Sequence, residues 1–245
     1  MGAVTVITSG KGGVGKSTLT AALGLALCER GRRVLLVDAD AGLGCLDHIL
    51  DISEEMVFDI SDVVSGITEP KKAVYTCPYC RNLFLLPAPA DENDIVSPDI
   101  MKQLIPMYKG FYDHILIDSP AGIGAGFLSS ISSAERALVV STADPICLKN
   151  TDRTRILLDK AGINNQRLVI NRFSTQDFRK QNYYNNLDSV IDNAGIRLIA
   201  VIPDDWELAA AAANSSPCLK KTAGVTAIFR LAARLEGEHV PLALK

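Results

Sequence analysis

Residues 3–18 read AVTVITSGKGGVGKST, and this stretch decides the fold. A run of β-branched and apolar residues ends at position 8, a glycine-rich loop follows, and helix-favouring residues continue from position 18. The loop satisfies the spacing GxxxxGK[ST] in the strand–loop–helix context that this phosphate-binding motif requires. Glycines let the backbone turn its N–H groups inward, and the following helix presents the positive end of its dipole to the phosphates. The stretch therefore predicts a nucleotide-binding loop.

Each part of the loop has an expected task. Lys16 is expected to neutralise the charge of the β- and γ-phosphates, and Ser17 to offer its hydroxyl to Mg²⁺. The nucleotide contacts are expected from nine consecutive residues: Gly10, Lys11, Gly12, Gly13, Val14, Gly15, Lys16, Ser17 and Thr18.

Outward from this loop, apolar strand-like runs alternate with helical segments. The later strand-like runs are RVLLVDAD, NLFLL, HILIDSP, RALVVSTAD, RLVINRF and RLIAVIPDD, and helices are predicted at residues 18–30, 126–133, 146–161, 181–193, 206–213 and 225–235. Near-continuous apolar strands indicate a parallel sheet that is buried on both faces. We therefore predict an α/β protein with the three-layer P-loop NTPase fold, in which helices flank both faces of a mostly parallel central sheet. Residues 1–245 are expected to form a single domain with an irregular, proline-containing insertion at residues 51–99.

Composition and charge exclude several classes of protein. The 245 residues carry a formal net charge of -3, and 48% of them are hydrophobic. The chain contains no apolar run of about 18 residues, which a membrane-spanning helix needs, and it begins without a basic-then-apolar leader. We therefore expect a cytoplasmic protein. The slight acidity disfavours nonspecific nucleic acid as a partner, and Trp206 is expected to pack in the core or at an edge.

Acidic side chains come at the ends of two expected strands. Asp38 and Asp40 end the run VLLVDAD, and Asp118 ends HILID. Ligands of open α/β sheets bind at the carboxyl ends of the strands, so these carboxylates are expected to face the nucleotide. Aspartates at strand ends also serve as helix caps, and the residues alone leave that possibility open.

The form KGGVGKST, with a second lysine at position 11, resembles the deviant Walker A motif of the MinD/ParA family of P-loop ATPases. VDADAGLGCLD is similar to the switch I segment of that family, ILIDSPAG to its Walker B motif and switch II, and VINRF and VIPDD to its adenine-side loops. The resemblance covers nearly the whole chain and is strongest to the MinD members. It implies an ATP-hydrolysing switch with slow basal turnover, activated by dimerisation and by a protein partner, that positions cell division or another cellular assembly.

The resemblance also implies roles for the charged residues. ATP would bring two subunits face to face, and Lys11 would reach the phosphates held by the opposite subunit. Asp40 would position the attacking water, and Asp38 would support Mg²⁺ or its water shell. Asp118 would hold Mg²⁺ through water.

The same resemblance implies an adenine site at the ends of the last two strands. Asn171 and Arg172 would contact the base on one side, and Pro203 and Asp204 would close the other. An asparagine or aspartate in a loop is also a common turn former, and these positions would serve equally well in that way.

Three features depart from the family pattern. The sequence closes with LEGEHVPLALK, where MinD proteins usually carry a basic amphipathic helix, so membrane contact is expected to be weak or indirect, through a partner. Gly44 and Cys45 stand where Arg and Asn are common, and Gly124 stands where Glu is common. The usual division-site partners therefore do not follow from the resemblance, and we expect a regulatory protein whose identity the sequence does not give.

Cys77 and Cys80 form a CPYC pair in the irregular stretch. Alone they supply half of a zinc or iron–sulfur site, although two copies in a symmetric dimer would supply four thiolates. Two inert thiols are the commoner outcome for such a pair. Metal binding would favour a second function, that of a metallocofactor-insertion or iron–sulfur carrier ATPase. A ParA-like partition ATPase is a third candidate function, and a non-hydrolysing nucleotide-binding scaffold is a fourth.

Overall fold

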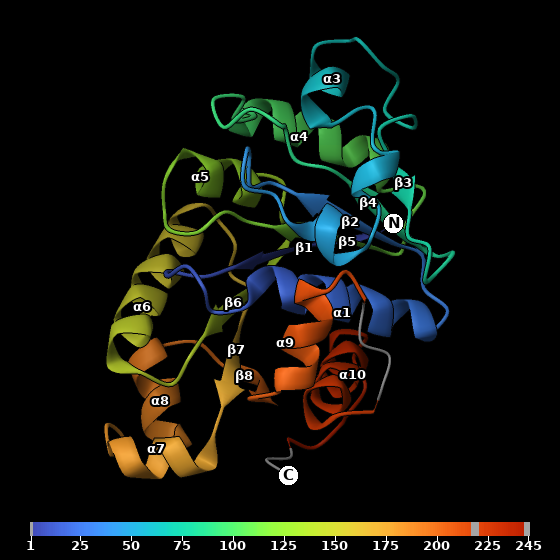
Figure 1. The fold of residues 1–245 in the computed structure, drawn as a ribbon. Coiled ribbons are helices and arrows are strands. Elements are labelled where there is room, and N and C mark those ends of the chain that lie inside the picture. The colour runs from blue at the N-terminus through green and yellow to red at the C-terminus, as the bar shows by residue number, and fades with distance from the viewer. Residues whose placement is uncertain (1, 217–220, 243–245) are drawn as a thin grey trace.

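The computed structural model describes residues 2–216 and 221–242, and a mixed sheet forms its centre (Figure 1). The strands follow the order β3-β4-β2-β5-β1-β6-β7-β8. They are β1 (Ala3–Thr8), β2 (Val34–Asp38), β3 (Tyr75–Thr76), β4 (Leu83–Leu86), β5 (His114–Asp118), β6 (Arg136–Ser141), β7 (Gln166–Phe173) and β8 (Leu198–Pro203). Only the edge pair β3–β4 is antiparallel among the described strands, which confirms the predicted mostly parallel sheet.

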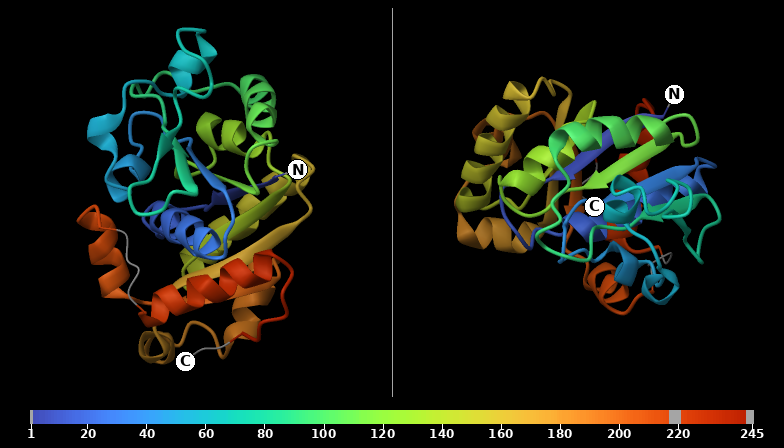
Figure 2. Two further views of the ribbon diagram at one scale, coloured as in Figure 1. Left: turned by 90° about the vertical axis from the view of Figure 1, so that its right-hand side faces the viewer. Right: turned by 90° about the horizontal axis from the view of Figure 1, so that it is seen from above.

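Helices cover both faces of the sheet, as predicted. Figure 1 shows α1, α9 and α10 together on one side and α4, α5 and α6 on the other, and Figure 2 shows the same layers from two further directions. The helices are α1 (Lys16–Glu29), α2 (Leu46–Ile49), α3 (Ile60–Val64), α4 (Pro98–Tyr108), α5 (Ala125–Ile131), α6 (Pro145–Lys160), α7 (Thr175–Gln181), α8 (Leu187–Ala194), α9 (Trp206–Ala213) and α10 (Ala223–Leu235), with a short 3-10 turn at Ser53–Glu55.

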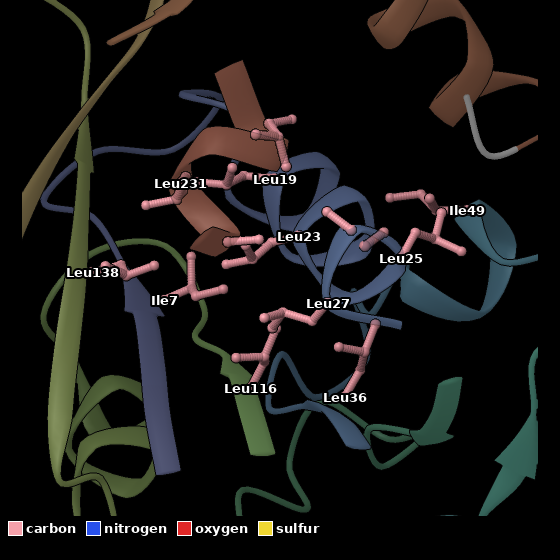
Figure 3. Packing of buried hydrophobic residues seen from close by; sticks show 14 of the residues in the cluster. Ile7, Leu19, Leu23, Leu25, Leu27, Leu36, Ile49, Leu116, Leu138 and Leu231 are labelled. Atoms are coloured by element: carbon pink, nitrogen blue, oxygen red, sulfur yellow. The ribbon is translucent and has the colours of Figure 1, made fainter. Parts of the chain in front are cut away.

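The apolar core lies in two layers, one on each face of the sheet. Successive strand residues point to opposite faces, so Leu36 belongs to the layer under α1 while its neighbour Leu35 belongs to the layer under α4 and α5. Figure 3 shows the first layer, in which Leu27 of α1 meets Leu116 of β5 and Leu25 faces Ile49 of α2. Each fully buried leucine contributes about 1.5–3 kcal/mol, and these contacts hold α1 against this face of the sheet.

Two predictions from the sequence were wrong. The helix expected at residues 181–193 begins only at Leu187, as α8. Asn182 takes a left-handed conformation (φ 49°) that ends the preceding helix α7 at Gln181, and Asn186 caps α8 by accepting a hydrogen bond from the N–H of Ser189. Trp206 is 77% exposed and does not pack in the core. It is the first residue of α9. Asp205 caps this helix by accepting a hydrogen bond from the N–H of Leu208, and it is the side chain of Leu208 that is buried.

The stretch expected to be irregular, residues 51–99, contributes to the sheet. It contains α3, the predicted strand NLFLL (β4) and the two-residue edge strand β3. Among the described residues, no helix has the length and apolar composition that crossing a bilayer requires.

Candidate functional site

The glycine-rich loop connects β1 to α1 at the carboxyl ends of the central strands. Gly15 ends the loop in the left-handed region (φ 90°), and α1 begins with the next residue, Lys16. A side chain at Gly15 would place its Cβ 2.6 Å from Nδ2 of Asn171, so a larger residue would displace the neighbouring loop. Lys16 is only 8% exposed, which directs its ammonium group into the site rather than to solvent. The loop therefore has the shape that phosphate binding requires.

Two predicted carboxylates lie side by side behind this loop. Asp38 and Asp118 are register partners on the neighbouring strands β2 and β5, and each is 2% exposed. Thr20, one turn into α1, donates a hydrogen bond to Oδ1 of Asp118 over 3.2 Å. The side chain of Ser17 lies beside this carboxylate and opposes the rise in its pKa. The hydroxyl of Ser17 and the carboxylate of Asp118 thus face the same space.

Burial disfavours the ionised form of both carboxylates. Desolvation, with repulsion by Asp38, raises the pKa of Asp118 to about 7. Desolvation also raises the pKa of Asp38 to about 6, although backbone N–H groups oppose the shift. A cation placed between the two side chains would favour their ionised forms. Hydroxyl and carboxylate oxygens are the ligands that Mg²⁺ prefers, usually with waters and substrate phosphates completing the shell, so the donor set fits this ion.

Asp38 also holds the segment that follows β2. Its Oδ1 accepts a hydrogen bond from the N–H of Asp40 (3.1 Å), and its Oδ2 accepts from the N–H groups of Cys45 (3.1 Å) and Leu46 (3.2 Å). Both carboxylate oxygens are therefore engaged by the backbone of residues 40–46. The predicted support of Mg²⁺ by Asp38 stays a prediction, whereas its contact with this loop is direct.

Asp40 and Lys11 lie at the more open side of the site. Asp40 is half-buried; burial raises its pKa, and the positive charge of Lys16 partly reverses that shift. Lys11 is exposed, and its carbonyl oxygen accepts a hydrogen bond from Ser9 Oγ over 2.7 Å. Its backbone is therefore anchored, and its exposed amine lies near enough to the start of α6 to help lower the pKa of Asp144.

The predicted adenine-side residues lie next to the phosphate loop. Asn171 at the end of β7 is 8% exposed, and its Nδ2 donates to the carbonyl oxygen of Val14 over 2.8 Å. Arg172 follows in a left-handed conformation (φ 53°) with an exposed side chain. Pro203 and Asp204 lie at the end of the neighbouring strand β8, where the N–H of Asp204 donates to the carbonyl oxygen of Phe173. The structure thus brings all four positions to the same edge of the sheet.

Sequence reasoning missed two residues of this site. Thr20 was overlooked because its bond to Asp118 spans 98 positions of sequence, although its place one turn after Ser17 on the same helix was a usable signal. Cys45 was noted only as a departure from the family, yet its thiol lies beside Ser17, whose side chain opposes the rise in the pKa of the thiol. Desolvation raises the pKa of this thiol, and the neighbouring carboxylates add to the effect.

The structure does not support the shared metal site that the sequence left open for the cysteine pair. Cys77 is buried in the core layer under α1, and Cys80 packs against the same layer. Burial raises the pKa of the Cys28 thiol on α1, and the neighbouring Cys80 and Cys77 add to the effect. Cys77 therefore presents its thiol to the core, whereas Cys80 is only half-buried. The described residues contain no cluster of three or more Cys, His, Asp or Glu side chains arranged to hold a metal ion.

Comparison with known proteins agrees with this geometry. Residues 5–218 match the family described as the CobQ/CobB/MinD/ParA nucleotide binding domain. The septum site-determining protein MinD of Thermotoga maritima is 38% identical over 99% of this chain and 91% of its own length. The chain belongs to the MinD family. It is therefore a MinD-like P-loop ATPase, and the predicted family and enzyme class are confirmed.

Solved structures of MinD proteins share the fold. MinD in the MinC:MinD cell division protein complex of Aquifex aeolicus superposes with a TM-score of 0.90 at 36% identity, covering 98% of both chains. The septum site-determining protein MinD of Pyrococcus horikoshii, complexed with Mg-ADP, has a TM-score of 0.86 at 30% identity over 96% of each chain. The predicted three-layer fold of this MinD-like chain is thereby confirmed.

Proposed function

We propose that this chain is a MinD-type switch that regulates the placement of the division site by binding Mg–ATP, pairing with a second copy and hydrolysing the ATP. The observation that carries the proposal is the contrast between the two lysines of one loop: Lys16 is buried within the site, and Lys11 is exposed at its rim. Residues 1–245 act as a single ATPase unit in this proposal.

The two lysines divide the work between two subunits. Lys16 neutralises phosphate charge in its own subunit from the moment the nucleotide binds. Lys11 extends from an anchored backbone and contacts the phosphates of the opposite subunit only after dimerisation. A cation delivered in trans to a transferring phosphoryl group increases rates by about 10³- to 10⁵-fold in related systems, so the monomer turns over slowly and dimerisation activates it.

The remaining site residues complete the reaction centre. Ser17 and Asp118 hold Mg²⁺, Asp118 through water, and the ion supplies charge stabilisation to the phosphates. Asp40 orients the attacking water, while Asp38 keeps the loop that carries Asp40 in place through its backbone hydrogen bonds.

The nucleotide contacts extend from the P-loop to the ends of β7 and β8. We assign ATP binding to Gly10, Lys11, Gly12, Gly13, Val14, Gly15, Lys16, Ser17, Thr18, Asn171, Arg172, Pro203 and Asp204. Asn171 contributes chiefly by fixing the loop, because one of its amide N–H groups is already donated to Val14.

The partner is a regulatory protein of the division machinery. The relative from Aquifex aeolicus occurs in a complex with MinC, and we propose a MinC-like partner for this chain. Gly44, Cys45 and Gly124 lie in the switch segments, so their departure from the common MinD residues changes which partner surface fits. Membrane contact is weak or indirect and passes through such a partner.

The decisive experiment compares Lys11→Ala with Lys160→Ala, a control that removes an exposed lysine from the far end of α6. Light scattering after size-exclusion chromatography, with Mg–ATP, Mg–ADP or neither, reports the mass of each variant. We expect the wild-type chain and the control to double their mass of 26.3 kDa only with ATP. Lys11→Ala is expected to bind nucleotide with unchanged affinity, to stay monomeric and to lose most ATP turnover. ATP-dependent pairing and turnover equal to those of the control would contradict the assignment.

The competing functions receive less support. A metallocofactor role receives less support, because Cys77 is buried in the core and Cys80 is half-buried against it. A partition role is less consistent with close relatives that are septum site-determining proteins. A non-hydrolysing scaffold would bind ATP and pair without releasing phosphate, and phosphate release in the same samples distinguishes it.

A further inference from the structure

A second concave surface lies at the edge of the sheet opposite the phosphate loop. This groove encloses about 580 Å³, within the range of about 300–1,000 Å³ that is typical of ligand sites. Its walls come from Arg33 just before β2, Lys71 before β3, Phe84 on β4, and Met107, Phe111 and Tyr112 at the end of α4 and before β5. Figure 1 shows α4 beside the edge strands β3 and β4. The groove contains none of the nucleotide-site residues, so we call it the edge groove.

Aromatic rings and cations alternate around the edge groove. The guanidinium carbon of Arg33 lies 5.5 Å from the ring centre of Phe84 and 5.7 Å from that of Tyr112. These two rings meet edge to face, with centroids 5.3 Å apart. On the other side, Nζ of Lys71 lies 5.2 Å from the ring centre of Phe111. Each cation is therefore held by a ring face through a cation–π contact.

The cations of the edge groove lack acidic partners. No ion pair joins Arg33 or Lys71 to a carboxylate within the part of the chain that the structure describes. Glu69 is the single acidic residue among those that line the groove, against these two cations. The lining thus carries two cations against one carboxylate on a chain with a net charge of -3, and Asp113, outside the lining, accepts a hydrogen bond from the backbone N–H of Arg33. A guanidinium stacked on rings still presents its edge N–H donors, which suit a carboxylate.

The groove is preformed and exposes apolar surface. Phe111 is 51% and Met107 is 56% exposed. Tyr108 donates a hydrogen bond from its hydroxyl to the carbonyl oxygen of Pro70 over 2.9 Å, which holds the Lys71 wall against α4. Exposed aromatic and methionine side chains next to unpaired cations are typical of recognition sites rather than of ordinary solvated surface.

An extended peptide fits this shape better than a compact small molecule. The edge groove opens onto β3, which is paired on one side only, with β4, in the described sheet. Thr76 of β3 lines the groove and is exposed. Peptides that bind at sheet edges pair with the backbone of the outer strand and place side chains in adjacent pockets.

We propose that the edge groove binds a short acidic segment of a partner protein, with an apolar side chain between Phe84 and Phe111 and flanking carboxylates at Arg33 and Lys71. This interaction surface is separate from the nucleotide site and from the face that carries Lys11. Binding there does not require ATP or a second copy of the chain, so the groove serves as a constant attachment point while the nucleotide site switches.

The test measures fluorescence anisotropy of a labelled, terminally blocked peptide, Glu-Glu-Leu-Phe-Glu-Glu, titrated with the full chain without nucleotide. We expect saturable binding tighter than about 1 mM, equivalent to about -4 kcal/mol, that weakens as salt is added. The double variant Arg33→Gln/Lys71→Gln and the variant Phe111→Ser are each expected to bind at least about tenfold more weakly, a change of about 1.4 kcal/mol. The double variant Arg197→Gln/Lys160→Gln removes two exposed cations elsewhere and is expected to bind like the wild-type chain.

Two control peptides test the stated chemistry. Replacing the glutamates by lysines, or the Leu-Phe pair by Ser-Ser, is expected to abolish saturation. Unchanged Mg–ADP affinity verifies that each variant is folded. The proposal is overturned if no acidic peptide saturates, if the lysine peptide binds equally well, or if the groove variants bind like the wild-type chain. Binding that appears only with ATP would place the site on the dimer face and overturn it too. Groove-dependent sedimentation with phosphatidylserine vesicles, without peptide binding, would assign the groove to lipid and refute the peptide claim.

Discussion

The clearest quantitative prediction concerns Asp38, which the structure places as the anchor of residues 40–46. Asp38→Ala removes the acceptor of three backbone N–H groups. The N–H of Leu46 is buried, so leaving it unpaired costs about 1–3 kcal/mol. The N–H groups of Asp40 and Cys45 are partly accessible and can bind water, so each loses at most about 1 kcal/mol. The variant also removes the desolvation cost of the buried Asp38 carboxylate and its repulsion with Asp118, which work in the opposite direction, so the net loss should be about 1–3 kcal/mol.

Urea unfolding followed by circular dichroism measures this loss directly. Asp38→Asn keeps one acceptor oxygen and should lose less stability than Asp38→Ala. Asp192→Ala, which removes an exposed carboxylate on α8, serves as the control and should unfold like the wild-type chain. Limited proteolysis should cut residues 40–46 faster in Asp38→Ala. An unfolding free energy equal to that of the control, with no faster cleavage, would refute the claim that Asp38 holds this loop.

Three further changes test other parts of the structure. Gly15→Ala places a side chain on a residue with a φ of 90° and against the loop that carries Asn171. Nucleotide affinity, measured by calorimetry, should therefore fall at least about tenfold. A side chain at Gly110 meets open space, so Gly110→Ala should leave nucleotide affinity unchanged. A second prediction concerns Glu236. Burial alone would raise the pKa of its carboxyl group, but contacts with arginines, led by Arg30, lower that pKa below its ordinary 4.5. The stability that Glu236 contributes is therefore present above pH 4.5 and disappears as pH falls through its lower folded-state pKa, so the difference in Tm between wild type and Glu236→Gln should close in acid; a constant difference would contradict the pairing. Cys77→Ser buries a hydroxyl in the core and should reduce the unfolding free energy by about 1–3 kcal/mol. Elemental analysis should find the same metal content in this variant and in the wild-type chain. A stoichiometric metal that is present in the wild-type chain and lost in the variant would support the metal hypothesis instead.

Local sequence signals were sufficient for the framework of this protein. The run of residues 3–18 predicted a strand, a phosphate loop and a helix, and the structure has β1, the loop and α1 at those positions. The strand pattern predicted the parallel, doubly covered sheet because burial on both faces requires continuous apolar runs. The sequence analysis missed α7 and placed the start of the following helix at residue 181 instead of Leu187. Asn182 ends α7 through its left-handed backbone and Asn186 begins α8 by capping it, and composition does not show which asparagines will do so.

The sequence by itself determined the fold, the phosphate loop and the strand-end carboxylates, because these depend on periodicity and on residues that are adjacent in the chain. The tertiary structure alone decided which side chains from distant parts of the chain come into contact. It turned Cys77 toward the core, brought Thr20 to Asp118 and Cys45 to Ser17, and assembled the edge groove from segments that are distant in the chain. Such contacts are set by how helices and strands pack against one another, and the free energies that select one packing are spread over the whole core rather than encoded at any single position.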